Sequence, residues 1–156
     1  MTETTVVLGA AIVQDLHLFV ARRSQPPSMA GYWELPGSEL TGDDRGSLQD
    51  LFTHEFGVQL RCVDQIQSDR MLVAWRTAEN DDVPASLRVW RCQFPSEMTL
   101  DMEMGDPRPN MYRYDDSSWV PIDALDTVGP WRDDMRIAAG EVADYYNSDV
   151  LWQSAD

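Results

Sequence analysis

Two short stretches, Gly31-Tyr-Trp-Glu-Leu-Pro-Gly-Ser38 and His54-Glu55-Phe-Gly-Val58, decide the fold expected for this chain. The segment that joins them carries apolar side chains at helical spacing: Leu48, Leu51, Phe52 and Phe56. That spacing predicts one amphipathic helix over residues 44–56, immediately after a turn at Pro36-Gly37. Asp43 or Asp44 can cap the start of this helix, and Gly57 is placed for a left-handed C-terminal stop.

The flanking segments predict strands and a second helix. Val6 to Val13 and Leu16 to Ala21 are apolar, β-branched runs around Gln14-Asp15, which is typical of a hairpin. A short extended piece is expected at Tyr32 to Leu35. Three more strands are expected at Val58 to Ile66, Met71 to Thr77 and Leu87 to Phe94, followed by a loop from Glu97 to Asp116. After the loop we expect a strand at Trp119 to Pro121 and one helical turn at Ile122 to Leu125. The final helix is expected from Trp131 to Tyr146 and should pack through Ile137, Val142 and Tyr145. This order suits a mixed sheet between helices.

Composition limits the possible functions. A chain of 156 residues fits a single domain, 1–156, and its longest early apolar run is too short to cross a membrane, so we expect a cytoplasmic protein with no membrane partner. The net charge of −15, with no Lys among 12 basic residues, disfavours a nucleic-acid polymer. A small nucleotide remains possible, because a few local arginines can reverse the field in one cleft. Cys62 and Cys92 show no metal or disulfide spacing and are expected to be reduced core thiols. The oligomeric state stays open.

The two quoted stretches resemble the motif of the Nudix family, G-x5-E-x7-R-E-U-x-E-E-x-G-U, where U is a bulky aliphatic residue. The resemblance covers nearly the whole chain, although only Gly31 to Val58 is specific to the motif. It implies an α/β fold with a mixed sheet sandwiched between helices. It also implies a hydrolase of nucleoside diphosphate derivatives that uses Mg²⁺ or Mn²⁺, with the Gly37 carbonyl and Glu55 as metal ligands.

The chain departs from this motif where the family places its catalytic glutamates. Aligned backward from Glu55-Phe-Gly-Val58, the arginine of the motif is Asp50, one glutamate is Leu51 and another is His54, and the box is two residues shorter. Leu51 extends the apolar stripe. His54 is either a surface histidine or a ligand better suited to Mn²⁺ or Zn²⁺ than to Mg²⁺. We therefore expect binding of Mg²⁺ to be weak.

Other carboxylates could replace the lost ligands. Asp50 would need a shift of helix register, because positions one residue apart point about 100° apart. Glu39, Asp43 and Asp44 could also turn toward a metal. In several family members a glutamate before the late tryptophan strand is a base or ligand, and Arg113 stands near that position here, with Asp115 and Asp116 as alternatives.

Substrate recognition resembles that of the MutT and CTP-pyrophosphohydrolase branch, which cleaves nucleoside triphosphates. The resemblance assigns the substrate to Arg23, Trp33, Leu35, Asp133 and Asp134, and predicts a base-sized cleft between Arg23, Leu35 and the start of the last helix. Asp133 and Asp134 could equally be charges that complement a helix N-terminus. Arg23 could be an ordinary charge at a strand end.

Two functions follow from the sequence. The first is metal-dependent cleavage of a nucleoside triphosphate or diphosphate derivative, with Glu55, His54 and Asp50 as the candidate catalytic residues. The second is a catalytically impaired module that binds a nucleotide or a protein partner.

Overall fold

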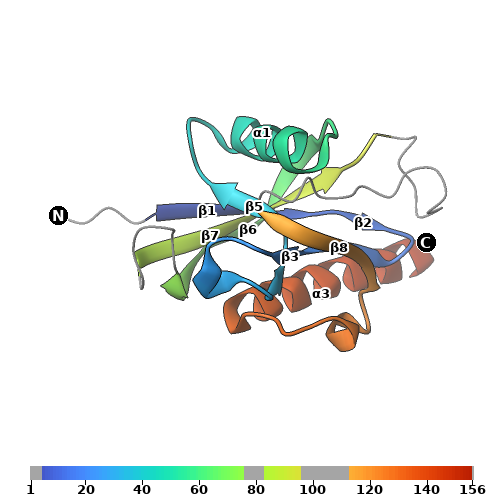
Figure 1. Cartoon of the computed structure of the whole chain (residues 1–156). Coiled ribbons are helices and arrows are strands. Elements are labelled where there is room, and N and C mark those ends of the chain that lie inside the picture. The colour runs from blue at the N-terminus through green and yellow to red at the C-terminus, as the bar shows by residue number, and fades with distance from the viewer. Residues whose placement is uncertain (1–4, 76–82, 96–112, 156) are drawn as a thin grey trace.

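The computed structural model of the chain has three layers, with a helix on each side of the β-sheets (Figure 1). It describes residues 5–75, 83–95 and 113–155, and the side chains at 5–67, 85–95 and 113–147. The helices are α1 (Asp44–Phe56) above the sheets and α3 (Asp133–Ala155) below them. The predicted α/β fold, a mixed sheet between helices, is confirmed.

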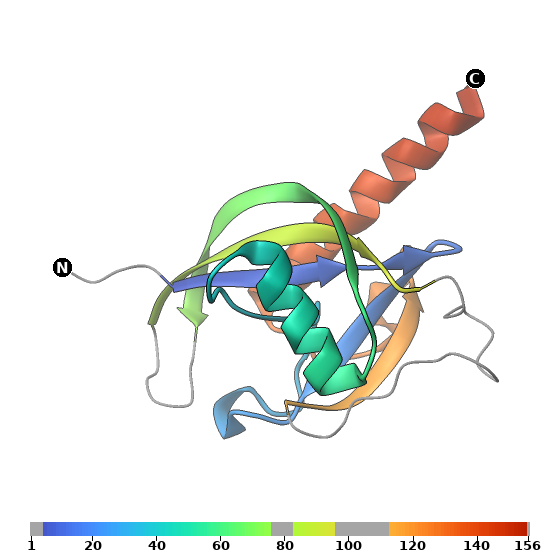
Figure 2. The same cartoon turned by 90° about the horizontal axis from the view of Figure 1, so that it is seen from above.

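The first sheet has four strands in the order β5-β1-β7-β6. These are β5 (Gly37–Glu39), β1 (Thr5–Ala11), β7 (Val83–Gln93) and β6 (Arg61–Trp75). The β1 and β7 strands run parallel, whereas β5 and β6 are antiparallel to their neighbours. The helix α1 lies across this sheet when it is viewed from above (Figure 2).

The second sheet is antiparallel and is built around β3 (His17–Arg23). This strand pairs with β2 (Val13–Gln14), β4 (Trp33–Glu34) and β8 (Tyr114–Pro121). The hairpin predicted around Gln14-Asp15 is confirmed by the β2–β3 pairing. A short helix η1 (Pro27–Met29) connects β3 to β4, and η2 (Leu125–Thr127) follows β8.

Alternation along the strands divides the core into two clusters. In β1, Val7 and Ala11 pack toward α3, and Leu8 and Ala10 pack toward α1. Successive side chains of a strand point to opposite faces, so a strand covered on both faces is apolar throughout. This explains the unbroken apolar runs at the start of the sequence. No helix in the described ranges is long and apolar enough to span a membrane.

The first motif helix is confirmed with its predicted caps. The side chain of Asp43 accepts a hydrogen bond from the Gly46 N–H at 2.6 Å, and Gly57 adopts a left-handed conformation with φ of 69°. Ser47 ties the short preceding loop to the helix, because its hydroxyl donates to the Thr41 carbonyl and accepts from the Thr41 N–H. These bonds hold the loop before α1 against the first turn of the helix.

Three predictions about the strands and their connections are wrong. One strand, β6, replaces the two expected at Val58 to Ile66 and Met71 to Thr77, because β7 pairs along its whole length and irregularities in register absorb the polar residues between. Gly37 begins β5 instead of a turn at Pro36-Gly37, since it pairs with Gly9 of β1. The loop was expected to reach Asp116, but Tyr114–Asp116 belongs to β8; the expected loop residues 97–112 lie outside the described residues.

The end of the chain also differs in detail. The helical turn lies at Leu125–Thr127, later than the turn expected at Ile122 to Leu125. Ile137 and Tyr145, expected on the packed face of the last helix, are 51% and 40% exposed. Val142, the third residue expected there, is buried as predicted, and the rest of the packed face is formed by Met135, Ala138, Ala139 and Ala143. Successive residues of a helix point about 100° apart, so a prediction that is shifted by one or two residues assigns solvent-facing positions to the packed face.

The two cysteines are neighbours on adjacent strands of the first sheet. Cys62 in β6 pairs directly with Cys92 in β7, and both are buried free thiols. Their separation in the sequence gave no sign of this proximity.

Replacing Phe52 by Ala is expected to lower the free energy of unfolding by roughly 3–5 kcal/mol, because a fully buried ring is lost. Phe52 stacks on Phe56 and meets Phe94 edge-on, at centroid distances of 5.1 and 5.8 Å. Urea unfolding measures the change. Thr53→Ala, on the exposed side of the same helix, should stay within about 0.5 kcal/mol of the parent. Equal stability of the two variants would contradict this packing of α1.

Candidate functional site

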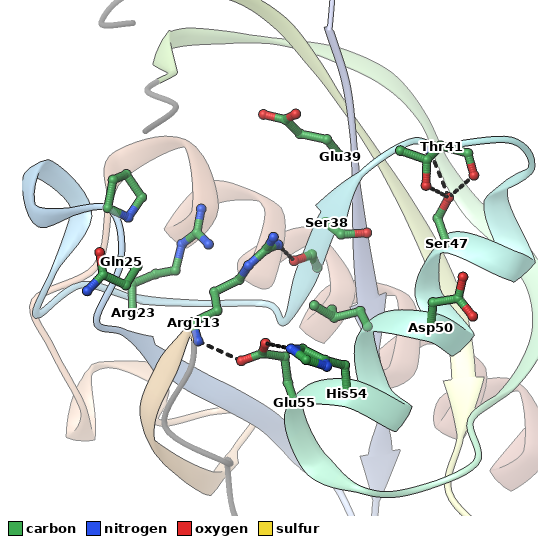
Figure 3. Close-up of a pocket in the computed structure, with 13 residues that line it drawn as sticks. Arg23, Gln25, Ser38, Glu39, Thr41, Ser47, Asp50, His54, Glu55 and Arg113 are labelled. Atoms are coloured by element: carbon green, nitrogen blue, oxygen red, sulfur yellow. Dashed lines mark hydrogen bonds and ion pairs between the residues drawn. The ribbon is translucent and has the colours of Figure 1, made fainter. Parts of the chain in front are cut away.

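A pocket of about 530 Å³ opens where the last turns of α1 face β5 and the start of β8 (Figure 3). Five residues proposed from the sequence line it: Arg23, Gly37, Asp50, His54 and Glu55. The other lining residues are Gln25, Pro26, Ser38, Glu39, Thr41, Ser47, Leu51 and Arg113. The structure therefore brings the two motif stretches and Arg113 together around one cavity.

The remaining substrate residues lie elsewhere. Trp33 and Leu35 belong to the core cluster against α3, and Leu35 has no exposed surface. Asp133 and Asp134 occupy the first turn of α3, outside the lining of this pocket. The described residues thus do not form the cleft predicted between Arg23, Leu35 and α3, because alternation along the chain turns Leu35 into the core. Substrate contact by these four residues stays a prediction.

Only glycine fits at position 37, because the backbone of β5 lies against that of β1 there. A Cβ at this position would overlap the Leu8 carbonyl oxygen in the neighbouring strand β1. The Gly37 N–H donates to the hydroxyl of Tyr114 at 2.9 Å. Its carbonyl oxygen accepts a hydrogen bond from Nη1 of Arg113 at 2.8 Å. Both polar groups of this glycine are therefore held by the start of β8.

A buried polar network lies behind the pocket. The Tyr114 hydroxyl donates to Oε2 of Glu34 at 2.8 Å, and Nε of Arg23 lies 3.3 Å from Oε1 of the same carboxylate. Burial, followed by the nearby charge of Glu34, raises the pKa of Tyr114 well above its usual value, so the hydroxyl stays protonated and can donate. Isolated charges are costly to bury, so Arg23 and Glu34 each need the other.

The motif face of α1 presents one enclosed carboxylate. Glu55 is 3% exposed, and its Oε1 accepts the backbone N–H of Arg113 at 2.7 Å. Leu51 is buried in the core cluster beneath α1, as the apolar stripe indicated. The His54 side chain is 66% exposed, and its Nε2 lies 3.8 Å from Oε2 of Glu55.

Most carboxylates considered as replacement ligands are bound elsewhere. Asp43 caps α1, and Asp44 accepts hydrogen bonds at 2.8 Å from Arg88 and from Nε1 of Trp90. Asp115 pairs with Arg22 at 2.7 Å. The carboxylate of Asp116 accepts the N–H of Ser117. Glu39 and Asp50 are the two of these alternatives that line the pocket.

These groups do not fit the divalent ion that the family resemblance implies. A hard cation such as Mg²⁺ needs several oxygen ligands in near-octahedral geometry. The described residues contain no cluster of three or more His, Cys, Asp or Glu side chains that could hold a metal. The two expected ligands, the Gly37 carbonyl and Glu55, already accept hydrogen bonds from Arg113.

Comparisons with solved structures settle the fold. The structure matches a MutT Nudix hydrolase from Burkholderia pseudomallei with a TM-score of 0.60 at 24% identity, over 88% of this chain and 97% of that one. It matches a Nudix hydrolase from Nitrosomonas europaea with a TM-score of 0.66 at 15% identity, over 94% and 90%. The chain has the Nudix fold. The Nudix domain of Shewanella oneidensis NrtR, solved in complex with ADP-ribose, matches with a TM-score of 0.67 at 15% identity, over 94% and 90%.

A sequence relative agrees with this Nudix assignment. It is a protein of Mycobacterium tuberculosis (strain H37Rv) named "Putative 8-oxo-dGTP diphosphatase 2", 28% identical over 133 residues, which are 76% of this chain and 82% of the relative. No protein-family model matches the chain. The resemblance to MutT-like Nudix proteins that the motif stretches indicated is therefore confirmed.

Sequence reasoning missed two residues that shape the site, Glu34 and Tyr114. A signal for Glu34 was present, because a carboxylate between Trp33 and Leu35 interrupts an apolar strand and needs a buried partner. Tyr114 gave no comparable signal, since its partners lie 77 and 80 residues away in the sequence.

Tyr114→Phe is expected to destabilise the protein by about 1–3 kcal/mol, because it leaves the buried Gly37 N–H and Glu34 carboxylate without their shared partner. Thermal and urea unfolding measure the loss. Tyr32→Phe, at an exposed tyrosine, is the matched control and should change stability by less than about 0.5 kcal/mol. If Tyr114→Phe is as stable as the control, the hydroxyl does not secure the Gly37 segment.

Proposed function

We propose that this protein binds a small nucleotide through its phosphates in the Arg23–Arg113 pocket, and that it cleaves pyrophosphate bonds weakly or not at all. One observation carries the proposal. Two arginines line the pocket, whereas the motif face of α1 offers a single buried carboxylate, Glu55, already hydrogen-bonded to Arg113.

Two arginines supply positive charge to one side of this pocket within a chain of net charge −15, although Glu39, Asp50 and Glu55 line it as well. Figure 3 shows Arg23 and Arg113 beside Gln25 on one side of the pocket, with Asp50 on the other. The backbone keeps them close, because the N–H groups of Ser24 and Gln25 both donate to the Arg113 carbonyl. Guanidinium groups bind phosphate oxygens with charge-assisted, often bidentate hydrogen bonds. A di- or triphosphate is therefore the ligand group that suits this side.

Weak cleavage follows from the chemistry of pyrophosphate. Its negative oxygens repel a nucleophile, and a divalent ion both neutralises them and acidifies the attacking water. The motif positions of α1 offer one carboxylate and one imidazole, and Glu39 and Asp50 do not form a cluster of three metal-binding side chains with them among the described residues, so a hard ion gains too few ligands to bind tightly. Binding of the nucleotide, supported by the NrtR domain solved with ADP-ribose, needs no such ion.

The second candidate is metal-dependent hydrolysis of a nucleoside triphosphate or diphosphate derivative. The name of the Mycobacterium tuberculosis relative favours it, as does the retained Glu55 at the end of the motif. In this case Asp50, Glu39 or His54 would have to supply the missing ligands after Arg113 moves away.

A nucleotide screen separates the two functions. We expect calorimetry to show saturable binding of at least one of dGTP, 8-oxo-dGTP, CTP and ADP-ribose. Release of phosphate or pyrophosphate with Mg²⁺ or Mn²⁺ should be the same for the parent and Glu55→Gln, because Glu55 then holds no catalytic ion. Asp123→Asn, at an exposed carboxylate outside the pocket, controls for the change of charge.

Turnover that Glu55→Gln abolishes and Asp123→Asn retains would establish the hydrolase and overturn the proposed binding function. An absence of binding and turnover for every nucleotide would refute both candidates.

A further inference from the structure

We infer that the guanidinium of Arg113 is the resident cation of this site: it takes the place of a divalent ion and receives the diphosphate group of the ligand without metal. The diphosphate part of this inference rests on the proposed function. The displacement of the ion rests on the contacts of Arg113 alone.

Arg113 contacts both groups that would have to coordinate an ion. Its Nη1 lies 2.8 Å from the Gly37 carbonyl oxygen, and its backbone nitrogen lies 2.7 Å from Oε1 of Glu55. These two acceptors come from β5 and α1, whereas Arg113 directly precedes β8. Figure 3 shows the backbone nitrogen of Arg113 beside Glu55, with the Arg113 side chain extending away from that carboxylate. A positive charge is therefore already present at the Gly37 carbonyl oxygen, and a backbone N–H of the same residue is bound to Oε1 of Glu55.

The position of Arg113 is fixed from both sides of its backbone. Its carbonyl accepts from the Ser24 N–H at 2.7 Å, and its N–H is held by Glu55. The next residue, Tyr114, is fully buried and bound to Gly37 and Glu34. An ion could displace the guanidinium by rotating the side chain, but it could not move the backbone N–H from Glu55 without breaking this network.

The guanidinium retains donors for a ligand. Arginine carries five N–H donors, and within the described residues the Gly37 carbonyl is the one hydrogen-bond acceptor of the Arg113 side chain. The side chain lines the open pocket, so donors remain directed toward an incoming anion. Arg23 lines the same pocket but shares its charge with Glu34. Arg113 is consequently the cation best placed to neutralise a diphosphate.

A guanidinium does part of what a metal ion does. It neutralises phosphate charge, but it binds no water whose pKa it could lower and cannot itself be deprotonated at ordinary pH. A site with Arg113 in place supports recognition of the diphosphate without generating hydroxide. The presence of the Arg113 guanidinium in place of a metal ion therefore accounts for the weak cleavage proposed above.

Titration with Mn²⁺ alone tests the displacement, with free Mn²⁺ followed by electron paramagnetic resonance. Arg113→Ala should bind one Mn²⁺ at least about tenfold more tightly than the parent, because the Gly37 carbonyl becomes available while Glu55 remains. Adding Glu55→Gln to Arg113→Ala should remove the gain. Arg22→Ala, which removes an arginine that pairs with Asp115 outside the pocket, should bind Mn²⁺ as the parent does.

Two results of this titration would overturn the inference. One is a parent protein that binds Mn²⁺ as tightly as Arg113→Ala, with an affinity that Glu55→Gln reduces. The other is a gain in Arg22→Ala equal to that in Arg113→Ala, which would reflect net charge alone. Unfolding curves for each variant establish that the folded protein is being compared.

Inorganic pyrophosphate tests the ligand. The parent should bind it with the same Kd in EDTA and in Mg²⁺, and Arg113→Ala should bind it about tenfold or more weakly in EDTA, as expected for loss of a charge-assisted hydrogen bond. Binding that requires Mg²⁺ in the parent would overturn the inference. If neither pyrophosphate nor any nucleotide binds, the proposed function fails, and the Mn²⁺ titration still decides whether Arg113 displaces the ion.

Discussion

The hydrogen bonds that Arg113 makes to Gly37 and Glu55 determine what this pocket can hold. They join β8 to β5 and to α1, three elements that otherwise belong to different sheets and layers. The same bonds occupy the Gly37 carbonyl and one oxygen of the Glu55 carboxylate, the two groups on which a metal would depend. The bonds of Arg113 therefore hold the pocket together and also oppose the binding of a metal. This is why we expect a Nudix fold without the metal-dependent hydrolysis that the family resemblance implies.

The network behind Arg113 explains why this arrangement holds. Glu34 is buried, and a buried carboxylate is tolerated only when it is paired and hydrogen-bonded. Arg23 supplies the opposite charge and Tyr114 supplies the hydrogen bond, and Tyr114 then secures the Gly37 N–H. The pocket arginines thus have different tasks: Arg23 balances a structural charge, whereas Arg113 points its remaining donors at the cavity.

Local patterns in the sequence predicted the local structure. The apolar spacing with Asp43 and Gly57 as caps gave α1 its observed bounds, and the apolar runs around Gln14-Asp15 gave the first hairpin. Contacts between distant residues were not predictable in this way. The continuity of β6 depends on β7, and the burial of Leu35 depends on α3. The motif alignment brought Arg113 to attention at a ligand position, but its bonds to Gly37 and Glu55 span 76 and 58 residues of sequence and required the fold.

A crystal structure of the protein soaked in Mn²⁺, with anomalous diffraction recorded from the metal, shows directly whether Arg113 excludes an ion from this site. We expect no anomalous peak between the Gly37 carbonyl and Glu55, with the Arg113 guanidinium bound to that carbonyl. A Mn²⁺ ion coordinated by both groups, with the Arg113 side chain turned away, would contradict this expectation.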